Sequence, residues 1–167
     1  MMLRGTAHRF GDDINTDYII SGKYKFKTLD MDELARHVME DLDPRFYERL
    51  QPGDFVVAGR NFGCGSSREQ APLALIHAKV GGVIAASFAR IFYRNAVNTG
   101  LPVIECDTSG ICQGDVLEVD LGGGDVHDIT RGLRVQARPL PPFMQRILTD
   151  GGLVAHIKKH GGFCLDG

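Results

Sequence analysis

Three short apolar runs, separated by segments of helical length, constrain the fold of this chain more than any other feature of its sequence. The runs are residues 55–59, 83–88 and 101–106, and each has the length and composition of a buried strand. Between them, residues 71–78 place alanine and leucine on one helical face, and residues 89–98 form a second helical segment. The order strand, helix, strand, helix, strand predicts a parallel sheet with right-handed crossover connections.

The flanking sequence adds further elements to this core. A helix is expected from Asp30, which caps it with Glu33 as the capping-box partner, until Pro44 stops it. After the core, alternating apolar and polar residues predict antiparallel strands, and a Pro-Pro pair opens a terminal helix that two glycines interrupt. The antiparallel strands are expected over residues 115–121 and 128–137, and the terminal helix from residue 141 onwards. At the other end of the chain, the sequence predicts a first strand over residues 4–10 and a loop over residues 15–22.

The predicted fold class is therefore α/β, with a parallel βαβ core and added antiparallel strands. With 167 residues and no internal repeat or low-complexity linker, residues 1–167 are expected to form a single domain. The 19 basic and 21 acidic residues give a net charge of −2 without a basic stripe, so a nucleic-acid partner is not expected. No apolar run approaches the roughly 18 residues that span a bilayer, and the start has no secretion signal, which predicts a cytoplasmic protein without a membrane partner.

The connection between the first apolar run and the following helix reads GRNFGCGSSREQ and covers residues 59–70. Gly63 and Gly65 permit positive φ and leave room for a ligand beside the backbone. Together with Cys64 between them, they are expected to form an anion-binding loop at the helix start, where free N–H groups and the helix dipole favour negative charge. We call residues 63–68 the serine loop.

The polar side chains of the serine loop add two functions to this turn. Ser66 and Ser67 can cap the helix, with Glu69 and Gln70 in the capping-box relation. Arg68 can hold a carboxylate through two parallel hydrogen bonds. The loop is therefore expected to hold a small carboxylate beside a serine oxygen. The alternative is a tight, well-capped turn without a ligand. Nucleotide-binding fingerprints and a GxSxG nucleophile elbow do not fit this sequence.

The cysteines give no sign of a metal centre. None of the four forms a CxxC pair, and their spacing suits neither a zinc site nor an iron–sulfur ligand set. We expect free thiols and no metal on this chain, with Cys64 as a small packing residue. The four positions are Cys64, Cys106, Cys112 and Cys164.

Two long motifs carry a resemblance to a known family. GRNFGCGSSREQ and GGVIAASFARIFYRNAVNTGLPVIE, the latter over residues 81–105, resemble the small subunits of 3-isopropylmalate dehydratase and homoaconitase. They are also similar to the C-terminal swivel domain of the aconitase superfamily. INTDYIISGKY, over residues 14–24, resembles the N-terminal segment of the same family, and the likeness runs from about residue 11 to 153. It implies the swivelling β/β/α fold.

The resemblance also implies roles for individual residues. Ser66 matches the serine that removes a proton from the carbon next to a carboxylate, a role that requires positive charge and N–H donors nearby. Ser67 and Arg68 match contacts to the substrate carboxylates, and Asp17 matches the aspartate of the N-terminal segment. Arg90 and Arg94 are expected to brace the serine loop rather than to react.

In this family, dehydration depends on a 4Fe-4S cluster whose open iron binds the leaving hydroxyl. Since this chain has no ligand set for a cluster, the resemblance implies a separate large subunit that carries the cluster. The expected protein is the small subunit of a hydro-lyase acting on a substituted malate, a dicarboxylate or tricarboxylate. 3-Isopropylmalate, in leucine biosynthesis, is the first choice, ahead of homoaconitate-type, dimethylmalate and citramalate substrates. A binding module that uses the same loop without chemistry is the alternative from another class.

The segment from Tyr24 to Thr28 departs from the family where its members select the substrate's side group. We expect Tyr24, Phe26 and Lys27 to line the pocket around that group. Neighbouring residues of an extended loop point in opposite directions, so Phe26 and the flanking Lys25 and Lys27 cannot all face the substrate. An inward Phe26 would favour alkylmalates and an inward lysine a tricarboxylate. We favour Phe26, because a lysine left unpaired beside an alkyl group is costly.

Overall fold

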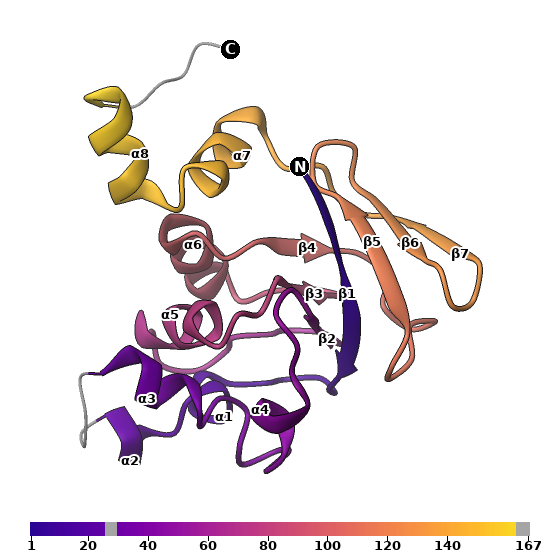
Figure 1. The fold of residues 1–167 in the computed structure, drawn as a ribbon, viewed down its shortest axis with the longest axis horizontal. Helices are drawn as coiled ribbons and strands as arrows, with labels where there is room; N and C mark the ends of the chain where they lie inside the picture. Colours follow the sequence, from indigo (N-terminus) through magenta and orange to yellow (C-terminus); the bar gives the residue numbers. More distant parts are fainter. Residues whose placement is uncertain (26–29, 163–167) are drawn as a thin grey trace.

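The computed structural model describes residues 1–25 and 30–162 of the chain, which form one mixed sheet and a layer of helices (Figure 1). The described strands belong to a seven-stranded sheet in the order β4-β3-β2-β1-β5-β6-β7. Their bounds are β1 Met2–Arg9, β2 Phe55–Ala58, β3 Gly82–Ala85, β4 Val103–Glu105, β5 Val116–Asp120, β6 Asp125–Asp128 and β7 Leu133–Gln136.

Strands β1 to β4 are all parallel and form the core of the sheet. Val57 of β2 pairs with Ile84 of β3, and Ile84 pairs with Ile104 of β4. Every residue of β2 and β3 is buried, as expected for parallel strands that are covered on both faces. The three predicted apolar strands and their parallel arrangement are therefore confirmed.

Strand β1 joins the parallel half of the sheet to the antiparallel half. It runs parallel to β2 on one side and antiparallel to β5 on the other, where Leu3 pairs with Val119. Strands β6 and β7 continue the sheet as antiparallel hairpins. The single strand expected over 128–137 is wrong: Asp128 ends β6, a turn follows, and Gly132 takes a φ of 68° before β7 starts. The alternation of apolar residues continues through this turn and conceals it.

The helices form a connected layer in which α3 contacts α5, α5 contacts α6, and α6 contacts both α7 and α8 (Figure 1). Helix α5 buries Ala71, Ala74 and Leu75, the face that its spacing predicts. The helix bounds are α1 Thr16–Ile19, α2 Gly22–Lys25, α3 Met31–Ala35, α4 Phe46–Arg49, α5 Gln70–His77, α6 Arg90–Thr99, α7 Pro142–Thr149 and α8 Leu153–His160.

The region before β2 differs most from the expected structure. The loop expected over 15–22 contains the short helix α1, and Asn15 caps it by accepting a hydrogen bond from the Tyr18 N–H at 3.1 Å. Asp30 does cap α3, but that helix ends at Ala35 rather than near Pro44. Met39 has a φ of 58°, a left-handed conformation that does not occur inside an α-helix.

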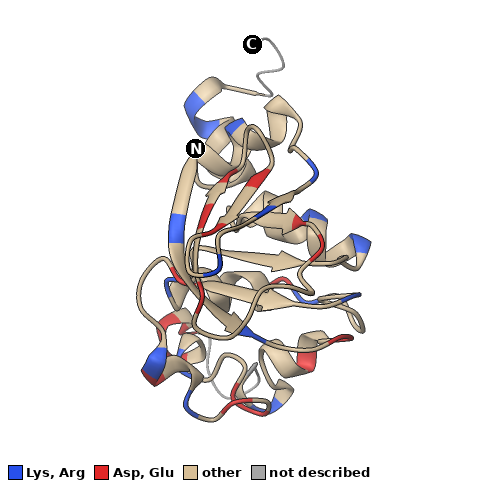
Figure 2. Ribbon diagram, turned by 90° about the vertical axis from the view of Figure 1, so that its right-hand side faces the viewer, with Lys and Arg blue, Asp and Glu red and all other residues tan. Residues whose placement is uncertain are grey.

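Acidic and basic residues are interspersed along the ribbon in the side view of Figure 2. Among residues 1–25 and 30–162, none of the helices has the length and apolar character needed to cross a bilayer.

Asp150 links the two C-terminal helices. Its carboxylate follows α7 and faces three side chains of α8: His156 at 2.8 Å, His160 at 3.0 Å and Lys159 at 3.1 Å. These hydrogen bonds lower the pKa of the Asp150 carboxyl to about 2, and the hydrogen bond with His156 has the largest effect. Because the pKa is lower in the folded state than in the unfolded chain, the stabilisation is complete above about pH 4. It is lost as the pH falls towards 2.

We therefore expect Asp150→Asn to lower the Tm at pH 7, with a difference from the parent protein that shrinks steadily between pH 4 and pH 2. Thermal unfolding followed by circular dichroism at several pH values measures this difference. Asp125→Asn, which affects an exposed pair with Arg134, serves as the control and should change the Tm little. A Tm difference for Asp150→Asn that stays constant down to pH 2 would contradict the assignment.

Candidate active site

The serine loop lies at the carboxyl edge of the parallel sheet, between β2 and α5. The segment after β3 runs beside it: the Phe62 N–H donates to the Ser87 carbonyl at 3.0 Å, and the Ala89 N–H donates to the Phe62 carbonyl at 2.9 Å. The Ser87 hydroxyl also accepts from the Asn61 N–H at 2.8 Å. This edge, where successive βα loops meet, is the usual place for a site in parallel α/β sheets.

The two glycines of the serine loop are required by its backbone and its surroundings. Gly63 and Gly65 have φ values of 83° and 89°, in the left-handed region that disfavours other residues. A Cβ atom on Gly63 would lie 2.2 Å from the ring of Phe92. Since Phe92 is buried and packs edge-to-face on Phe62, at 5.2 Å between ring centroids, it has no space to retreat. The serine loop thus packs closely against the first turn of α6.

The N-terminal segment holds the serine loop from the other side. The Gly63 N–H donates to the Ile14 carbonyl at 2.7 Å, and the Thr16 N–H donates to the Cys64 carbonyl at 3.0 Å. The buried Thr16 hydroxyl donates to the Ser66 carbonyl at 2.8 Å. Three hydrogen bonds therefore fix the backbone of the loop up to the residue predicted to react.

Arg68 and Asp17 form an ion pair beside the serine loop. The Arg68 side chain is only 18% exposed, whereas that of Asp17 is 61% exposed. A Cβ atom on Gly22, at the start of α2, would lie 3.6 Å from the guanidinium group, so α2 begins against this pair. Asp17 therefore orients Arg68, and a contact of Asp17 to the substrate stays a prediction.

Ser66 and Ser67 are both exposed, and neither caps α5. That helix begins at Gln70 after Glu69, and no side chain caps its first turn, so the expected capping box is wrong. The loop instead turns towards Thr16, which removes both serines from the helix start. Among the described residues, the N–H groups of Ser66, Ser67 and Arg68 donate to no other backbone group. These free donors and the guanidinium group make the exposed loop suitable for an anion.

A hollow of about 340 Å³, the serine hollow, opens beside the loop. Ser67 and Arg68 line it, and the Asn95 amide donates to the Ser67 hydroxyl at 3.4 Å across it. Ser66 and Asp17 do not belong to its lining, which consists of Thr16, Gly63, Gly65, Ser67, Arg68, Ala89, Arg90, Ile91, Phe92 and Asn95. A second hollow of about 540 Å³ adjoins it, and Arg90 lines both.

The predicted selectivity segment is described only in part. Tyr24 does not line the serine hollow; its ring stacks on His37 at 3.8 Å between centroids. A hydrogen bond to the Glu40 carboxylate, with a smaller contribution from burial, raises the pKa of Tyr24. Phe26 and Lys27 lie outside the described residues. A substrate contact of all three residues stays a prediction.

Sequence reasoning missed Thr16 and Asn95 as residues of the site. Both lie inside motifs that carry the family resemblance, the N-terminal segment and SFARIFYRNA, and this is the signal that could have found them. Arg90 and Arg94 were expected to brace the serine loop. Arg90 is an exposed residue at its edge, whereas Arg94 lines the neighbouring hollow.

The described cysteines do not fit an iron–sulfur cluster, which is held by several thiolates. Cys64, Cys106 and Cys112 are free thiols, and no group of three potential metal ligands in the described part of the chain contains any of them. Burial, with a smaller effect from Asp107, raises the pKa of the Cys106 thiol to about 11, which disfavours a thiolate. The three-ligand group that does occur among the described residues is the ion-paired cluster of Asp150, His156 and His160.

Known proteins are similar to this chain in both sequence and fold. The family described as the aconitase C-terminal domain matches residues 14–108. A 3-isopropylmalate dehydratase small subunit of Archaeoglobus fulgidus is 58% identical over 161 residues, covering 96% of this chain and 98% of that protein. The methanogen homoaconitase small subunit of Methanothermobacter thermautotrophicus is 52% identical, covering 95% of this chain and 92% of its own.

A solved structure agrees with this relationship. The crystal structure of a 3-isopropylmalate dehydratase from Methanocaldococcus jannaschii superposes with a TM-score of 0.92 at 45% identity, and the match covers 96% of each chain. The two chains are therefore similar in both sequence and fold over nearly their full length. The chain therefore belongs to the aconitase C-terminal domain family, among the small subunits represented by 3-isopropylmalate dehydratase and homoaconitase.

Proposed function

We propose that this protein is the small subunit of a 4Fe-4S-dependent hydro-lyase that acts on a substituted malate, with 3-isopropylmalate as the preferred substrate. The observation that carries the proposal is the exposed Ser66, fixed by the N-terminal segment beside the oriented Arg68. The names of the nearly full-length relatives support the substrate. A large subunit would supply the cluster, since the described cysteines of this chain do not fit one.

In this proposal Ser66 removes the proton from the carbon next to a substrate carboxylate. An ordinary serine hydroxyl is a poor base, so the Ser66 oxygen needs positive charge and N–H donors that stabilise its ionised form. Arg68 and the free N–H groups of the serine loop are placed to give this stabilisation. A cluster held by the large subunit would supply a Lewis acid for the hydroxyl on the neighbouring carbon.

Substrate contacts are assigned to residues in and beside the serine hollow. Ser67 and Arg68 hold a carboxylate, and Asp17 keeps the guanidinium group in place by pairing with it. Within the anion loop of Gly63, Cys64 and Gly65, the exposed Gly65 allows the substrate to approach the backbone, whereas Gly63 makes room for the ring of Phe92. Tyr24, Phe26 and Lys27 select the variable group of the substrate, because α2 begins beside Arg68.

Related functions remain as alternatives within the proposal. A homoaconitate-type substrate is supported by the homoaconitase relative. Dimethylmalate and citramalate are also alkyl-substituted malates, which differ from isopropylmalate in the size, number and position of the alkyl groups. A binding module without chemistry is disfavoured, because the match to the dehydratase small subunits covers nearly the whole chain. We further propose that residues 1–167 act as one cytoplasmic domain without a nucleic-acid or membrane partner.

Reconstitution tests the proposed function. Treated anaerobically with iron and sulfide, the isolated chain is expected to gain no stoichiometric 4Fe-4S absorbance, since its described thiols do not converge. Hydratase activity should appear only after the large subunit is added. A panel of isopropylmalate, dimethylmalate, citramalate and homoaconitate then ranks the substrates by kcat/KM. A stable 4Fe-4S signal from the isolated chain would contradict the proposal that the large subunit supplies the cluster.

A further inference from the structure

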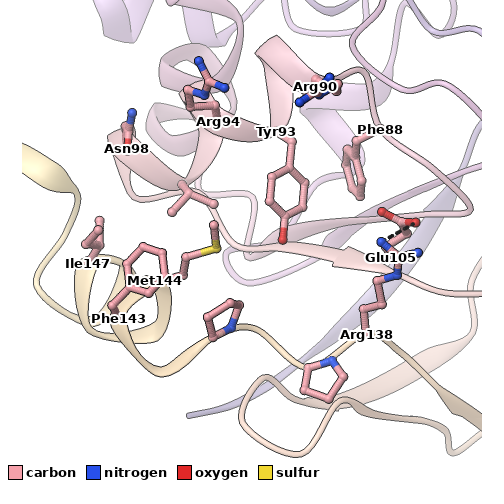
Figure 3. A pocket seen from close by; sticks show the side chains of 13 residues that line it. Phe88, Arg90, Tyr93, Arg94, Asn98, Glu105, Arg138, Phe143, Met144 and Ile147 are labelled. Atoms are coloured by element: carbon pink, nitrogen blue, oxygen red, sulfur yellow. Dashed lines mark ion pairs between the residues drawn. The ribbon is translucent and has the colours of Figure 1, made fainter. Parts of the chain in front are cut away.

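The larger of the two hollows lies beside the proposed active site but takes no part in it. We call it the arginine hollow; it measures about 540 Å³. Figure 3 shows Tyr93 and Arg94 of α6 on one side, Phe143 and Met144 of α7 on the other, and Glu105 and Arg138 at one end. Its lining comes from the end of the β3–α6 connection and from α6, from Glu105 at the end of β4, and from the segment after β7 that includes α7.

The arginine hollow is bordered by exposed apolar side chains. Phe143 is 41% exposed at its edge, and Ile91, on the wall of the adjoining serine hollow, is 55% exposed. Both residues stand on helices that bury other residues against the core, such as Phe92 on α6 and Ile147 on α7. Exposed apolar side chains beside a hollow indicate a site of contact with another molecule.

The charged groups around the arginine hollow are mainly basic and available. Arg138 lies 4.0 Å from Glu105, with 83% of its side chain exposed. Arg90 and Arg94 are exposed as well, and among the described residues neither has a carboxylate within ion-pair distance. The face therefore presents more positive than negative charge, which is complementary to an acidic surface.

We propose that the arginine hollow is a docking site for the large subunit, and that it receives a segment with an apolar side chain flanked by carboxylates. The inference rests on the proposed function. A large subunit that brings a substrate to Ser66 and Ser67 must cover the serine hollow, and Arg90 is a common wall of the two hollows. A partner that reaches beyond Arg90 along α6 meets Arg94, and Phe143 lies on the other side of the arginine hollow (Figure 3).

The shape of the arginine hollow favours a macromolecular partner over a small ligand. Sites for small molecules enclose most of the ligand and place a few polar groups inside. Here the apolar Phe143 and the guanidinium groups of Arg90 and Arg94 stand exposed at the rim. Val97 and Ile147, which are buried, also line the hollow. A buried apolar part surrounded by exposed aromatic and arginine residues is the usual composition of a protein–protein interface.

The test measures association and turnover separately. Phe143→Asp and Arg94→Glu are each expected to raise the Kd for the large subunit by at least about 10-fold, measured by calorimetry on the full-length subunits. At saturating large subunit, kcat should stay unchanged. Ser66→Ala should show the opposite result, an unchanged Kd with reduced kcat. Leu133→Asp and Arg134→Glu on β7 are matched controls, because they place the same charges on an exposed strand away from both hollows.

The possible outcomes separate the two proposals. If the parent subunits associate and Phe143→Asp and Arg94→Glu bind as tightly as the parent, the docking site is wrong while the proposed function stands. If the parent chain does not associate with the large subunit, both are wrong. Saturable binding of isopropylmalate to the isolated chain, abolished by Arg94→Glu with the Kd between subunits unchanged, would make the arginine hollow a small-molecule site and overturn the proposal. Unfolding curves of all variants confirm that each is folded.

Discussion

Replacing Ser66 by alanine is expected to lower kcat of the reconstituted enzyme by about 10²- to 10⁴-fold, the usual contribution of a general base. The reason is that a base acts on the proton only in the transition state, so its removal affects turnover rather than substrate binding. KM should therefore change little. Steady-state kinetics at saturating large subunit give both constants.

The neighbouring hydroxyl provides the matched control for Ser66. Ser67→Ala removes the same group one residue further along, where the side chain lines the serine hollow and is bonded to Asn95. We expect this variant to raise KM more than it lowers kcat, because its role is to hold a carboxylate. A loss in kcat of less than about tenfold for Ser66→Ala would exclude Ser66 as the general base, since a general base usually contributes more to the rate. Equal effects of both variants would argue for a shared binding role.

Arg68→Lys is expected to raise KM by about 10- to 100-fold, because an ammonium group cannot replace the two parallel hydrogen bonds of a guanidinium group to a carboxylate. A smaller loss in kcat should accompany it, because Arg68 also stabilises the ionised oxygen of Ser66 in the proposed mechanism. Initial rates over a range of isopropylmalate concentrations measure both effects. If Arg68→Lys left both constants unchanged, the carboxylate anchor would have to be sought elsewhere.

Asp17 allows the role of Arg68 to be tested through its partner. Asp17→Asn removes the ion pair and should raise KM in the same direction as Arg68→Lys, though less. If Asp17 acts only by orienting the guanidinium group, the double variant should be no worse than Arg68→Lys alone. Additive effects of the two changes would instead indicate that Asp17 contacts the substrate itself. Asp12→Asn, in an exposed pair with Arg60, is the control and should leave KM unchanged.

Local patterns in the sequence were sufficient to predict the parallel core of the fold. The three apolar runs became β2, β3 and β4 in a parallel arrangement, because a strand buried on both faces needs a continuous apolar run. Gly100 ends α6 in a left-handed conformation, and Gly151 and Gly152 separate α7 from α8, as the glycine pattern predicts. These features depend on residues that are close together in the chain.

The same local reasoning failed where distant contacts decide the conformation. The serines do not cap α5, because Thr16, fifty residues earlier in the chain, binds the Ser66 carbonyl and draws the loop away from the helix start. The helix after Asp30 ends early, because Met39 turns to donate its N–H to the Ile19 carbonyl at 2.9 Å. Capping and periodicity describe preferences of about 1 kcal/mol, which tertiary contacts readily outweigh.

The sequence by itself thus determined the chemistry of the serine loop: its glycines, its hydroxyls and its arginine follow one another in the chain, and their motif identifies the family. Only the tertiary structure decided how these groups are arranged. The crossover from β1 to β2 brings Thr16 and Asp17 against Ser66 and Arg68, and α6 places Arg90 between two hollows. No local pattern encodes such contacts, because they form only when β1 lies beside β2 and the connecting segment folds back over the carboxyl edge of the sheet.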